Sequence, residues 1–559
     1  MIGNNIENKL KQLAKKILGD DHIKIRRDIK VFIPEKIEYG DFSSNILFLF
    51  AKILKENPQN IFEKYKNDFY KSIPFAERLE IKGGYLNIFV NKQMLFNFYK
   101  NILLKKFEVL KNNLGKKQKF IIEYVSANPT GPLHIGNARG AILGDILTNL
   151  FKLCNFRVTK EYYVNDRGRQ VNILINTILY NLGLKEYSEE YYKGDYVKEI
   201  ANFFEDKIDR LSQEKLRKFV VSYVLKNYIK ISLNKFGTRF DNFYFESDLY
   251  KENLDDKILN ILKKNNLIEE KEGAIWLKLT KIGEFKDEVL IKKDKEPTYF
   301  FSDILYNYEK LFIRKYKYSL IIVASDHQDH VRRLSAVFEK IFNVKPKNFQ
   351  FLVYQMVHLQ KENEILKMSK RKGTFISLDD ILNMVEAPAL RFYFAKYSPE
   401  NTIEVDLDLL KKESEENPIW YTLYTYARFR GIIKKAKEQK FLLNRNSIKT
   451  NLNKSFNYIK DKEDYLKILR IFIQFSQLIP ESAISLRPNI IFQAFLNLCK
   501  ELNSFYEKVR ILENDDNTKS RLLFVVCVIN FLEFLFNIFG INPQKHLSKF
   551  QNDNRDKKS

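Results

Sequence analysis

Two short segments of this chain carry residues that could bind phosphate. The segment SANPTGPLHIGNARGAILGD (126–145) places His134 where a loop ends and a helix is predicted to begin. A helix N-terminus presents unpaired N–H groups and a partial positive charge, which favour phosphate. The segment KMSKRKG (367–373) brings three lysines into one loop, and mobile ammonium groups suit a polyphosphate. Either segment alone fits an ordinary helix start or a solvated basic loop, but the pair predicts a nucleotide site.

The helix predicted after His134 carries Gly136, Gly140 and Gly144 on one face. Glycine costs a helix interior about 1 kcal/mol relative to alanine, so each glycine needs a reason. We expect Gly136 to leave space where the adenine of a bound nucleotide packs against the helix. Gly140 and Gly144 are expected to let the helix lie close to a sheet.

An α/β domain is expected to position these segments. KFIIEY (119–124) is an apolar strand before the first segment, and RVTKEYYV (157–164) follows the helix at the distance of a right-handed βαβ crossover. YSLIIVAS (318–325) and FQFLVYQMVHL (349–359) continue the strand pattern toward KMSKRKG. The pattern predicts a Rossmann-type parallel sheet, whereas beyond residue 400 only helices are expected.

With 559 residues the chain is too long for one core, and its patterns predict a multidomain protein that is α/β in one part and all-α in another. The expected parts are an α+β N-terminal module over 1–110, a Rossmann-type parallel-sheet catalytic domain over 115–380 with a mostly helical insertion at about 170–295, a connecting segment over 381–417 and a helical bundle over 418–559.

The formal charge of +25 favours a polyanionic partner such as nucleic acid. A composition rich in Lys, Asn, Ile and Phe also fits an A+T-biased genome, which would raise the lysine content by itself. The apolar stretch RLLFVVCVINFLEFLFNIFGI (521–541) contains Asn530 and Glu533 and is expected to be a buried helix, not a membrane span. The amphipathic N-terminus does not have the pattern of a signal peptide, so we expect a cytoplasmic protein without a membrane partner.

Cysteines give no sign of a metal site. Cys154, Cys499 and Cys527 are far apart and form no CxxC pair, so no structural zinc is expected. His327 and His330 could share a metal ion by spacing, but no cysteine lies near them in sequence.

The two candidate phosphate-binding segments, together with several others along the chain, resemble the arginyl-tRNA synthetase family. PLHIGN and KMSKRKG are similar to the HIGH and KMSKS signatures of class I aminoacyl-tRNA synthetases. The resemblance covers nearly the whole chain, including the N-terminal YGDFSSNILFLFAK. The further segments that match the pattern of this family are EYYVNDRGRQV, FESDLY, TYFFSDILY, MSKRKGTFISLDDIL, ALRFYF and VDLDLLKKESEENPIWYTLYTYARF.

The resemblance implies an arginine–tRNA ligase that uses ATP with Mg²⁺ to form arginyl-adenylate and transfers the arginyl group to tRNA(Arg). It also implies that tRNA must be bound before the amino acid is activated. A monomer is expected. Among the implied ATP-binding residues, His134, Lys367 and Lys370 would have catalytic roles; the full set is His134, Gly136, Asn137, Lys367, Met368 and Lys370.

A pocket for arginine should present carboxylates and a hydroxyl or aromatic face, because a guanidinium is planar, always charged and rich in donors. By resemblance these groups are Glu246, Asp303 and Tyr299. Without the resemblance, a helix-capping role for Asp303 and a surface position for Glu246 would be the favoured interpretation. Other arginine-binding positions implied by the family are Glu123, Asn128 and His327, with Asn165, Asp166 and Gln170 as architecture of the site.

For tRNA, the resemblance implies contacts from Tyr85 and Asn87, although KGGYLNIFV (82–90) lacks the proline that the family usually has there. The helical C-terminal part would bind the anticodon. Two alternatives remain open at this point. One is a class I synthetase for another amino acid, such as cysteine or glutamate, and the other is a catalytically inert tRNA-binding paralogue.

Overall fold

The computed structural model describes residues 2–251, 253–284, 286–361, 364–366, 376–441, 445–513 and 515–550. The chain forms two compact units. The first comprises residues 1–114, 153–155 and 418–559, and the second comprises 115–152 and 156–417. Each unit is described by itself below.

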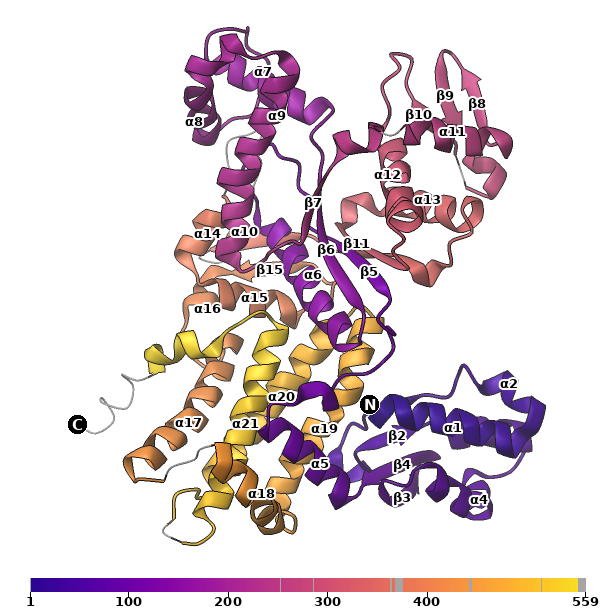
Figure 1. The fold of residues 1–559 in the computed structure, drawn as a ribbon, viewed down its shortest axis with the longest axis vertical. Coiled ribbons are helices and arrows are strands. Elements are labelled where there is room, and N and C mark those ends of the chain that lie inside the picture. The colour runs from indigo at the N-terminus through magenta and orange to yellow at the C-terminus, as the bar shows by residue number, and fades with distance from the viewer. Residues whose placement is uncertain are drawn as a thin grey trace. The chain divides into compact units, whose positions relative to one another are not determined.

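The second unit is built on a five-stranded parallel sheet of order β12-β11-β5-β6-β7 (Figure 1). Its strands are β5 (Lys119–Glu123), β6 (Arg157–Val164), β7 (Asn242–Phe245), β11 (Tyr318–Ala324) and β12 (Phe349–Tyr354). Chain order reverses between β5 and β11, and at such a point the loops beyond the strand ends diverge and leave a crevice for a ligand. The predicted Rossmann-type sheet is confirmed.

Helix α6 (Ile135–Leu153) covers one face of this sheet, and its glycines allow the close approach. A Cβ atom at Gly144 would lie 2.3 Å from the ring of Tyr124, the residue that follows β5. One at Gly140 would lie 3.0 Å from the hydroxyl of Tyr354 at the end of β12. The expected packing role of both glycines is confirmed.

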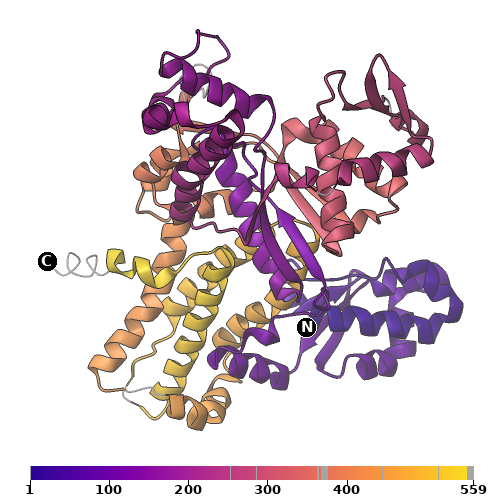
Figure 2. The same cartoon turned by 45° about the horizontal axis from the view of Figure 1, so that its top comes forward.

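Helix α12 (Tyr299–Tyr308) lies on the other side of the strands from α6, as both views show (Figures 1 and 2). It continues into the π-helical turn η8 (Glu309–Ile313). Tyr306 packs with Tyr163 of β6 in a core that also contains Ile321 of β11. Helix α13 (Gln328–Ala336), which follows β11, contributes to the same core.

Strand β7 divides the expected insertion at 170–295 into two segments. The first segment is helical and contains α7 (Arg169–Asn181), α8 (Asp195–Phe204), α9 (Gln213–Val224) and α10 (Lys230–Phe236). The second contains α11 (Leu254–Lys264) and an antiparallel sheet of β8 (Ile268–Lys271), β9 (Ala274–Leu277) and β10 (Glu288–Ile291). Between them, the four residues of β7 return to pair with β6.

A small sheet follows the parallel one. It contains β13 (Val357–Lys361), β14 (Glu364–Leu366) and β15 (Ile403–Asp406), accompanied by α14 (Leu378–Met384), α15 (Ala387–Lys396) and α16 (Leu407–Lys411). The expectation that no strand occurs beyond residue 400 was therefore wrong. Four residues show too little alternation to reveal β15, which exists because it pairs in parallel with β13.

The first unit combines an antiparallel sheet with a helical bundle. The sheet has the order β1-β2-β4-β3, and Gly83 and Gly84 connect the antiparallel strands β3 (Ala76–Lys82) and β4 (Tyr85–Val90). The other elements of this part are α1 (Ile2–Leu18), α2 (His22–Ile25), β1 (Val31–Phe32), β2 (Phe42–Ser44), α3 (Ile46–Leu54), α4 (Pro58–Ser72) and α5 (Lys92–Leu103).

The bundle consists of α17 (Pro418–Glu438), α18 (Arg445–Ile459), α19 (Glu463–Ile484), α20 (Asn489–Lys508) and α21 (Thr518–Ile538). Helix α5 packs against α19 and α21. By length and hydropathy α21 could cross a membrane, but 83% of its apolar window is buried inside the protein. This burial agrees with the core helix expected from the sequence.

Candidate active site

The loop after β5 turns sharply toward β6. Val125 and Ser126 have φ angles of +67° and +35°, and the Ser126 N–H donates to the carbonyl of Tyr124 at 2.9 Å. A β-branched residue in this region is strained, and such strain is common at ligand sites. The Ser126 hydroxyl accepts a hydrogen bond from the N–H of Tyr163 at 3.1 Å, which fixes the turn to β6.

His134 is exposed at the beginning of α6. Its N–H donates to Oδ1 of Asn137 at 3.0 Å, so the Asn137 side chain caps the helix. A Cβ atom at Gly136 would lie 3.0 Å from the imidazole of His134. The space that we assigned to adenine is therefore bordered by the imidazole, and Gly136 lets this ring lie over the helix start.

Lys367, Met368 and Lys370 lie outside the described residues. Leu378, further along the chain, is fixed next to His134, because its N–H donates to the carbonyl of Leu133 at 2.8 Å. Ser377 caps α14 and forms a reciprocal capping box with Asp380.

Glu246 is a buried acid, with only 5% of its surface exposed. Ser302 Oγ donates to its Oε1 at 2.8 Å. In the amide orientation that satisfies both groups, Asn165 Nδ2 donates to its Oε2 at 2.8 Å. Burial raises the pKa of Glu246 to about 7, and the nearby charge of Asp303 also raises it, against the Ser302 hydrogen bond. The alternative that Glu246 is a surface acid is excluded.

Asp303 lies inside α12, whose N-cap is Thr298, so it is not a capping residue. Its Oδ2 is 2.6 Å from Nε2 of His330 on α13. Tyr299, one turn earlier, is half exposed. A Cβ atom at Gly168 would lie 2.8 Å from the Tyr299 hydroxyl, and this hydroxyl also lies near Asn165. Asn165 therefore links Tyr299 with Glu246, and Asp303 is near enough for its charge to act on Glu246.

His327 does not join this group. It is exposed, and Nε2 lies 3.6 Å from Oδ1 of the adjacent Asp326. His330, which the sequence interpretation treated only as a possible metal ligand, is the histidine that faces Asp303. The sequence could have indicated His330 as a site residue, because it lies in the first turn of the helix that follows β11. Among the described residues, no three His, Cys, Asp or Glu side chains form a cluster that could hold a metal ion.

Glu123, at the end of β5, forms a buried ion pair. Its Oε2 lies 2.5 Å from Nζ of Lys310, whose side chain is fully buried and also donates to Asn307 at 3.2 Å. Burial raises the pKa of Glu123, and Lys310 opposes this effect. The sequence interpretation missed Lys310, although it lies two helical turns after Asp303.

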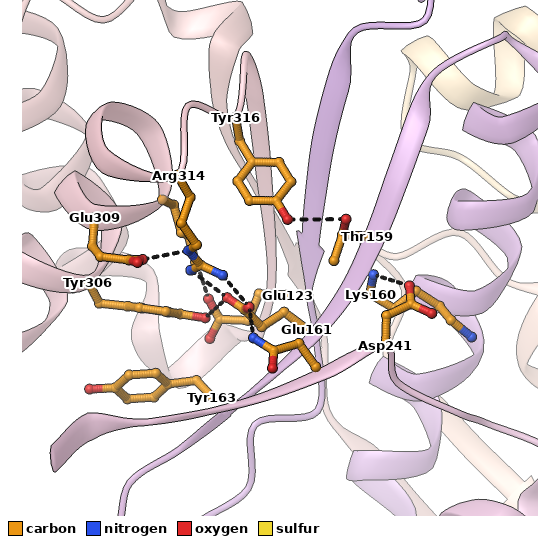
Figure 3. A network of polar contacts seen from close by, with 12 residues as sticks. Glu123, Thr159, Lys160, Glu161, Tyr163, Asp241, Tyr306, Glu309, Arg314 and Tyr316 are labelled. Atoms are coloured by element: carbon orange, nitrogen blue, oxygen red, sulfur yellow. Dashed lines mark hydrogen bonds and ion pairs between the residues drawn. The ribbon is translucent and has the colours of Figure 1, made fainter. Parts of the chain in front are cut away.

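Glu161, next to Glu123 in the sheet, anchors the same helix (Figure 3). Arg314 binds its carboxylate through two nitrogens, at 2.5 and 2.9 Å. The Tyr306 hydroxyl donates to it at 2.6 Å. The C-terminal half of α12 with η8 is therefore fixed to β5 and β6 by two acid–base contacts.

Asn128 lies in the loop after β5, where its Nδ2 donates to Oε1 of Gln170 at 2.9 Å. Asp166 Oδ1 accepts from the N–H of Ser247 at 2.9 Å. Together with Asn165 on Glu246, these contacts show that Asn165 and Gln170 each hold a proposed arginine-binding residue, whereas Asp166 fixes the backbone next to Glu246.

Tyr85 and Asn87 differ in accessibility. Tyr85 is 41% exposed, and its ring forms edge contacts with Phe32 and Phe48 at 5.4 and 4.8 Å between centroids. Asn87 is buried, and its Oδ1 accepts from Ser43 Oγ at 2.5 Å. Of these two residues, only Tyr85 is accessible to a partner in this structure.

Comparison with known families agrees with this architecture. Residues 99–396 match the profile described as "tRNA synthetases class I (R), catalytic domain". Residues 2–90 match "Arginyl tRNA synthetase N terminal domain". The chain belongs to the arginyl-tRNA synthetase family. Like other arginyl-tRNA synthetases it has a helical C-terminal part, where residues 422–547 match "DALR anticodon binding domain".

Individual arginyl-tRNA synthetases align over nearly the whole chain. The arginine–tRNA ligase of Thermotoga maritima is 32% identical, with 93% of this chain and 95% of that protein covered. That of Lawsonia intracellularis is 34% identical, with 92% and 95% covered. The structure of Thermus thermophilus arginyl-tRNA synthetase superposes with a TM-score of 0.71 at 19% identity and covers 97% of this chain and 99% of that one, which supports the fold.

Proposed function

We propose that this chain is an arginine–tRNA ligase. It activates L-arginine with ATP to arginyl-adenylate and transfers the arginyl group to the 3′-terminal adenosine of tRNA(Arg), releasing AMP and diphosphate. The observation that carries this proposal is the pair of acids Glu246 and Asp303 beside Tyr299, in a family member with a Rossmann-type sheet.

The guanidinium of arginine is bound by Glu246 and Asp303, with Tyr299 at its side. Two nearby carboxylates raise each other's free energy when the pocket is empty, and a cation between them relieves the repulsion. Lysine provides no planar fork to satisfy both acids, so it leaves buried acceptors unpaired and binds more weakly. His327 lies after β11, at the crevice where the chain order reverses, and is available to the substrate from its exposed position.

The α-amino group is bound by Glu123, and Asn128 contacts the α-carboxylate. Lys310 takes one oxygen of Glu123, whereas Oε1 accepts no hydrogen bond from the described residues. That oxygen is free to accept from an ammonium group. The lysine also favours the ionised form of Glu123, which an ammonium ligand needs.

In the activation step, a carboxylate oxygen of arginine attacks the α-phosphorus of ATP and diphosphate leaves. His134, Gly136 and Asn137 hold ATP at the N-terminus of α6, where the helix dipole favours phosphate. Lys367, Met368 and Lys370 complete the ATP site by their match to the KMSKS signature. The two lysines stabilise the charge that develops on the phosphates, so catalysis is by positioning and electrostatics.

Mg²⁺ accompanies ATP and, when bound, offsets negative charge on the phosphate oxygens. We propose that the nucleotide carries this cation into the site. Transfer then requires the terminal ribose hydroxyl of tRNA to attack the arginyl carbonyl, with AMP as the leaving group.

For tRNA binding, we propose that Tyr85 stacks on a nucleotide base and that the helical bundle binds the anticodon. We further propose that Asn87 supports the Tyr85 surface from inside the sheet. The domain limits 1–110, 115–380, 381–417 and 418–559 remain our proposal for how these tasks are divided. The enzyme is proposed to act as a cytoplasmic monomer.

The decisive experiment is charging of tRNA(Arg) transcripts with radiolabelled arginine, with lysine and glutamate as comparisons. We expect arginine alone to be incorporated. Equal charging with lysine would contradict the specificity, and no charging with any amino acid would favour an inert tRNA-binding paralogue. ATP–diphosphate exchange is expected only when tRNA is added; exchange at the same rate without tRNA would contradict that dependence.

A further inference from the structure

The hydroxyl of Tyr163 is buried and lacks a partner. Tyr163 is 9% exposed, and its Oη forms no hydrogen bond with any described residue. A buried polar atom without a partner is costly, because its hydrogen bonds to water are lost and not replaced. Such atoms in native proteins are uncommon and call for an explanation, and a bound ligand is one.

Strand geometry directs Tyr163 toward the proposed arginine pocket. Side chains two residues apart lie on the same face of a strand, so Tyr163 shares a face of β6 with Glu161. Glu161 contacts Tyr306, and the Tyr163 ring packs on that same tyrosine with centroids 4.3 Å apart (Figure 3). Tyr163 is two residues nearer the carboxyl end of β6, which is the ligand-binding edge of a parallel sheet.

The charges of acidic residues of the pocket act on the hydroxyl. Burial raises the pKa of Tyr163 well above its usual value, and the charges of Glu246, Asp303 and Glu123 raise it further. The phenol is therefore neutral at any physiological pH. A neutral hydroxyl has one donor and can accept as well, so it can accept from a guanidinium N–H while donating to a carboxylate.

We propose that Tyr163 is a further substrate-contacting residue, whose buried hydroxyl accepts a hydrogen bond from the guanidinium of bound arginine. The inference rests on the proposed function, because it assumes that the pocket binds arginine. It also explains why the hydroxyl is kept: the unliganded protein bears the cost of an unpaired polar atom, and the substrate supplies the partner.

The test compares Tyr163→Phe with a matched control. Tyr465 of α19, in the other unit, is also buried with an unpartnered hydroxyl. Tyr465→Phe removes the same atom from a residue that does not belong to the unit with the proposed pocket. For both variants and the wild type, one measures the Tm without ligand, the Tm shift caused by arginine, and the KM for arginine, ATP and tRNA in charging.

We expect Tyr163→Phe to raise the KM for arginine roughly 10- to 100-fold, the effect of losing a hydrogen bond to a charged group. The arginine-induced Tm shift should shrink accordingly, whereas the unliganded Tm should equal or exceed that of the wild type. Tyr465→Phe should likewise keep or raise the Tm, but leave the KM for arginine unchanged.

Two results would overturn the inference. One is an unchanged arginine KM and Tm shift in Tyr163→Phe. The other is a lower unliganded Tm, which would mean that the hydroxyl has a structural partner. Failure of the proposed function gives a different pattern, in which the wild type itself shows no arginine-induced Tm shift and charges no tRNA with arginine.

Discussion

Asp303 and His330 face each other across α12 and α13, with 2.6 Å between Oδ2 and Nε2. Burial lowers the pKa of His330, but the hydrogen bond and charge of Asp303 outweigh burial and raise the pKa overall. Arg333 and Glu288 also act on the imidazole, in opposite directions, and the ring of Phe300 packs edge-on against it. A protonated His330 therefore occupies the carboxylate that we propose binds the guanidinium of arginine.

The first prediction concerns pH. Arginine binding should displace the proton of His330, so the KM for arginine should fall as pH rises through the raised pKa, by about tenfold per pH unit at most for one linked proton. His330→Gln should weaken this pH dependence of the KM, and we attribute the dependence that remains to the ionisation of Glu246. An identical slope in wild type and variant would contradict the competition between arginine and the His330 proton.

In the unliganded protein, the Asp303–His330 pair stabilises the fold below a pH of about 6.5. This contribution is lost as pH rises through the His330 pKa.

Glu246→Gln should separate stability from binding. The pKa of Glu246 is raised from 4.5 to about 7, so the folded state holds the proton more tightly than the unfolded state. Unliganded stability should therefore decrease as pH rises from 4.5 to about 7, and the full penalty is present at pH 8.

At pH 8 we expect the Gln variant to gain up to about 3 kcal/mol in free energy of unfolding, measured by urea denaturation. The Asn165 amide can turn to accept from the new amide. The same variant should bind arginine more weakly. If the difference in free energy of unfolding between the variant and the wild type is the same at pH 8 as at pH 4.5, Glu246 is not held neutral by burial.

Lys310→Met should be strongly destabilising, because it leaves the Glu123 carboxylate buried without its cation. Breaking a buried pair on one side costs about 3–5 kcal/mol. The double variant Glu123→Gln, Lys310→Met removes both charges and should recover most of the loss. Lys412→Met is the control: Lys412 lies 3.1 Å from Glu416 in an exposed pair, and we expect a change below about 1 kcal/mol. Equal losses in the single and double variants would refute charge pairing as the cause.

Gly144→Ala should destabilise the protein although alanine favours a helix. Its Cβ would lie 2.3 Å from the Tyr124 ring, and overpacking of this kind costs about 1–3 kcal/mol. Gly431 of α17 has no heavy atom within 4 Å of the equivalent position. Gly431→Ala should therefore stabilise by up to about 1 kcal/mol. Thermal unfolding of both variants compares the two sites, and a stabilising Gly144→Ala would show that α6 can move away from the sheet.

Tyr85→Ala should raise the KM for tRNA(Arg) and leave the KM for arginine unchanged. Base–aromatic stacking is worth about 1–3 kcal/mol, so we expect roughly a 5- to 100-fold effect. Tyr85→Phe keeps the ring and should retain most of the affinity. If the alanine variant charges tRNA with the wild-type KM, the exposed ring is not a tRNA contact.

Much of the architecture could be predicted because it depends on local patterns. The β5–α6–β6 unit follows from an apolar strand, a proline-rich loop and a helix start, and the parallel pairing from the length of the crossover. Strand β15 could not be predicted, since its four residues are held by pairing with a strand more than forty residues earlier.

In the candidate site, the residues of α12 were identified by resemblance, but their protein partners were not. His330 and Lys310 meet Asp303 and Glu123 through the packing of helices on the sheet. A single sequence gives the face of each helix but not which faces meet. Tyr163 was missed for a related reason, because alternation along β6 shows its direction but not that its hydroxyl lacks a partner.

In the proposed site, α12 with η8 carries residues that act at both ends of the substrate. Asp303 lies at the guanidinium end, and Lys310 holds Glu123 at the α-amino end. Because one continuous helical segment, α12 followed by the π-helical turn η8, carries both Asp303 and Lys310, the separation of these two residues is set by the helix and not by the substrate. The helix thus works as a ruler for side-chain length, so homoarginine, with the same charged group and one more methylene, should be rejected by its length alone.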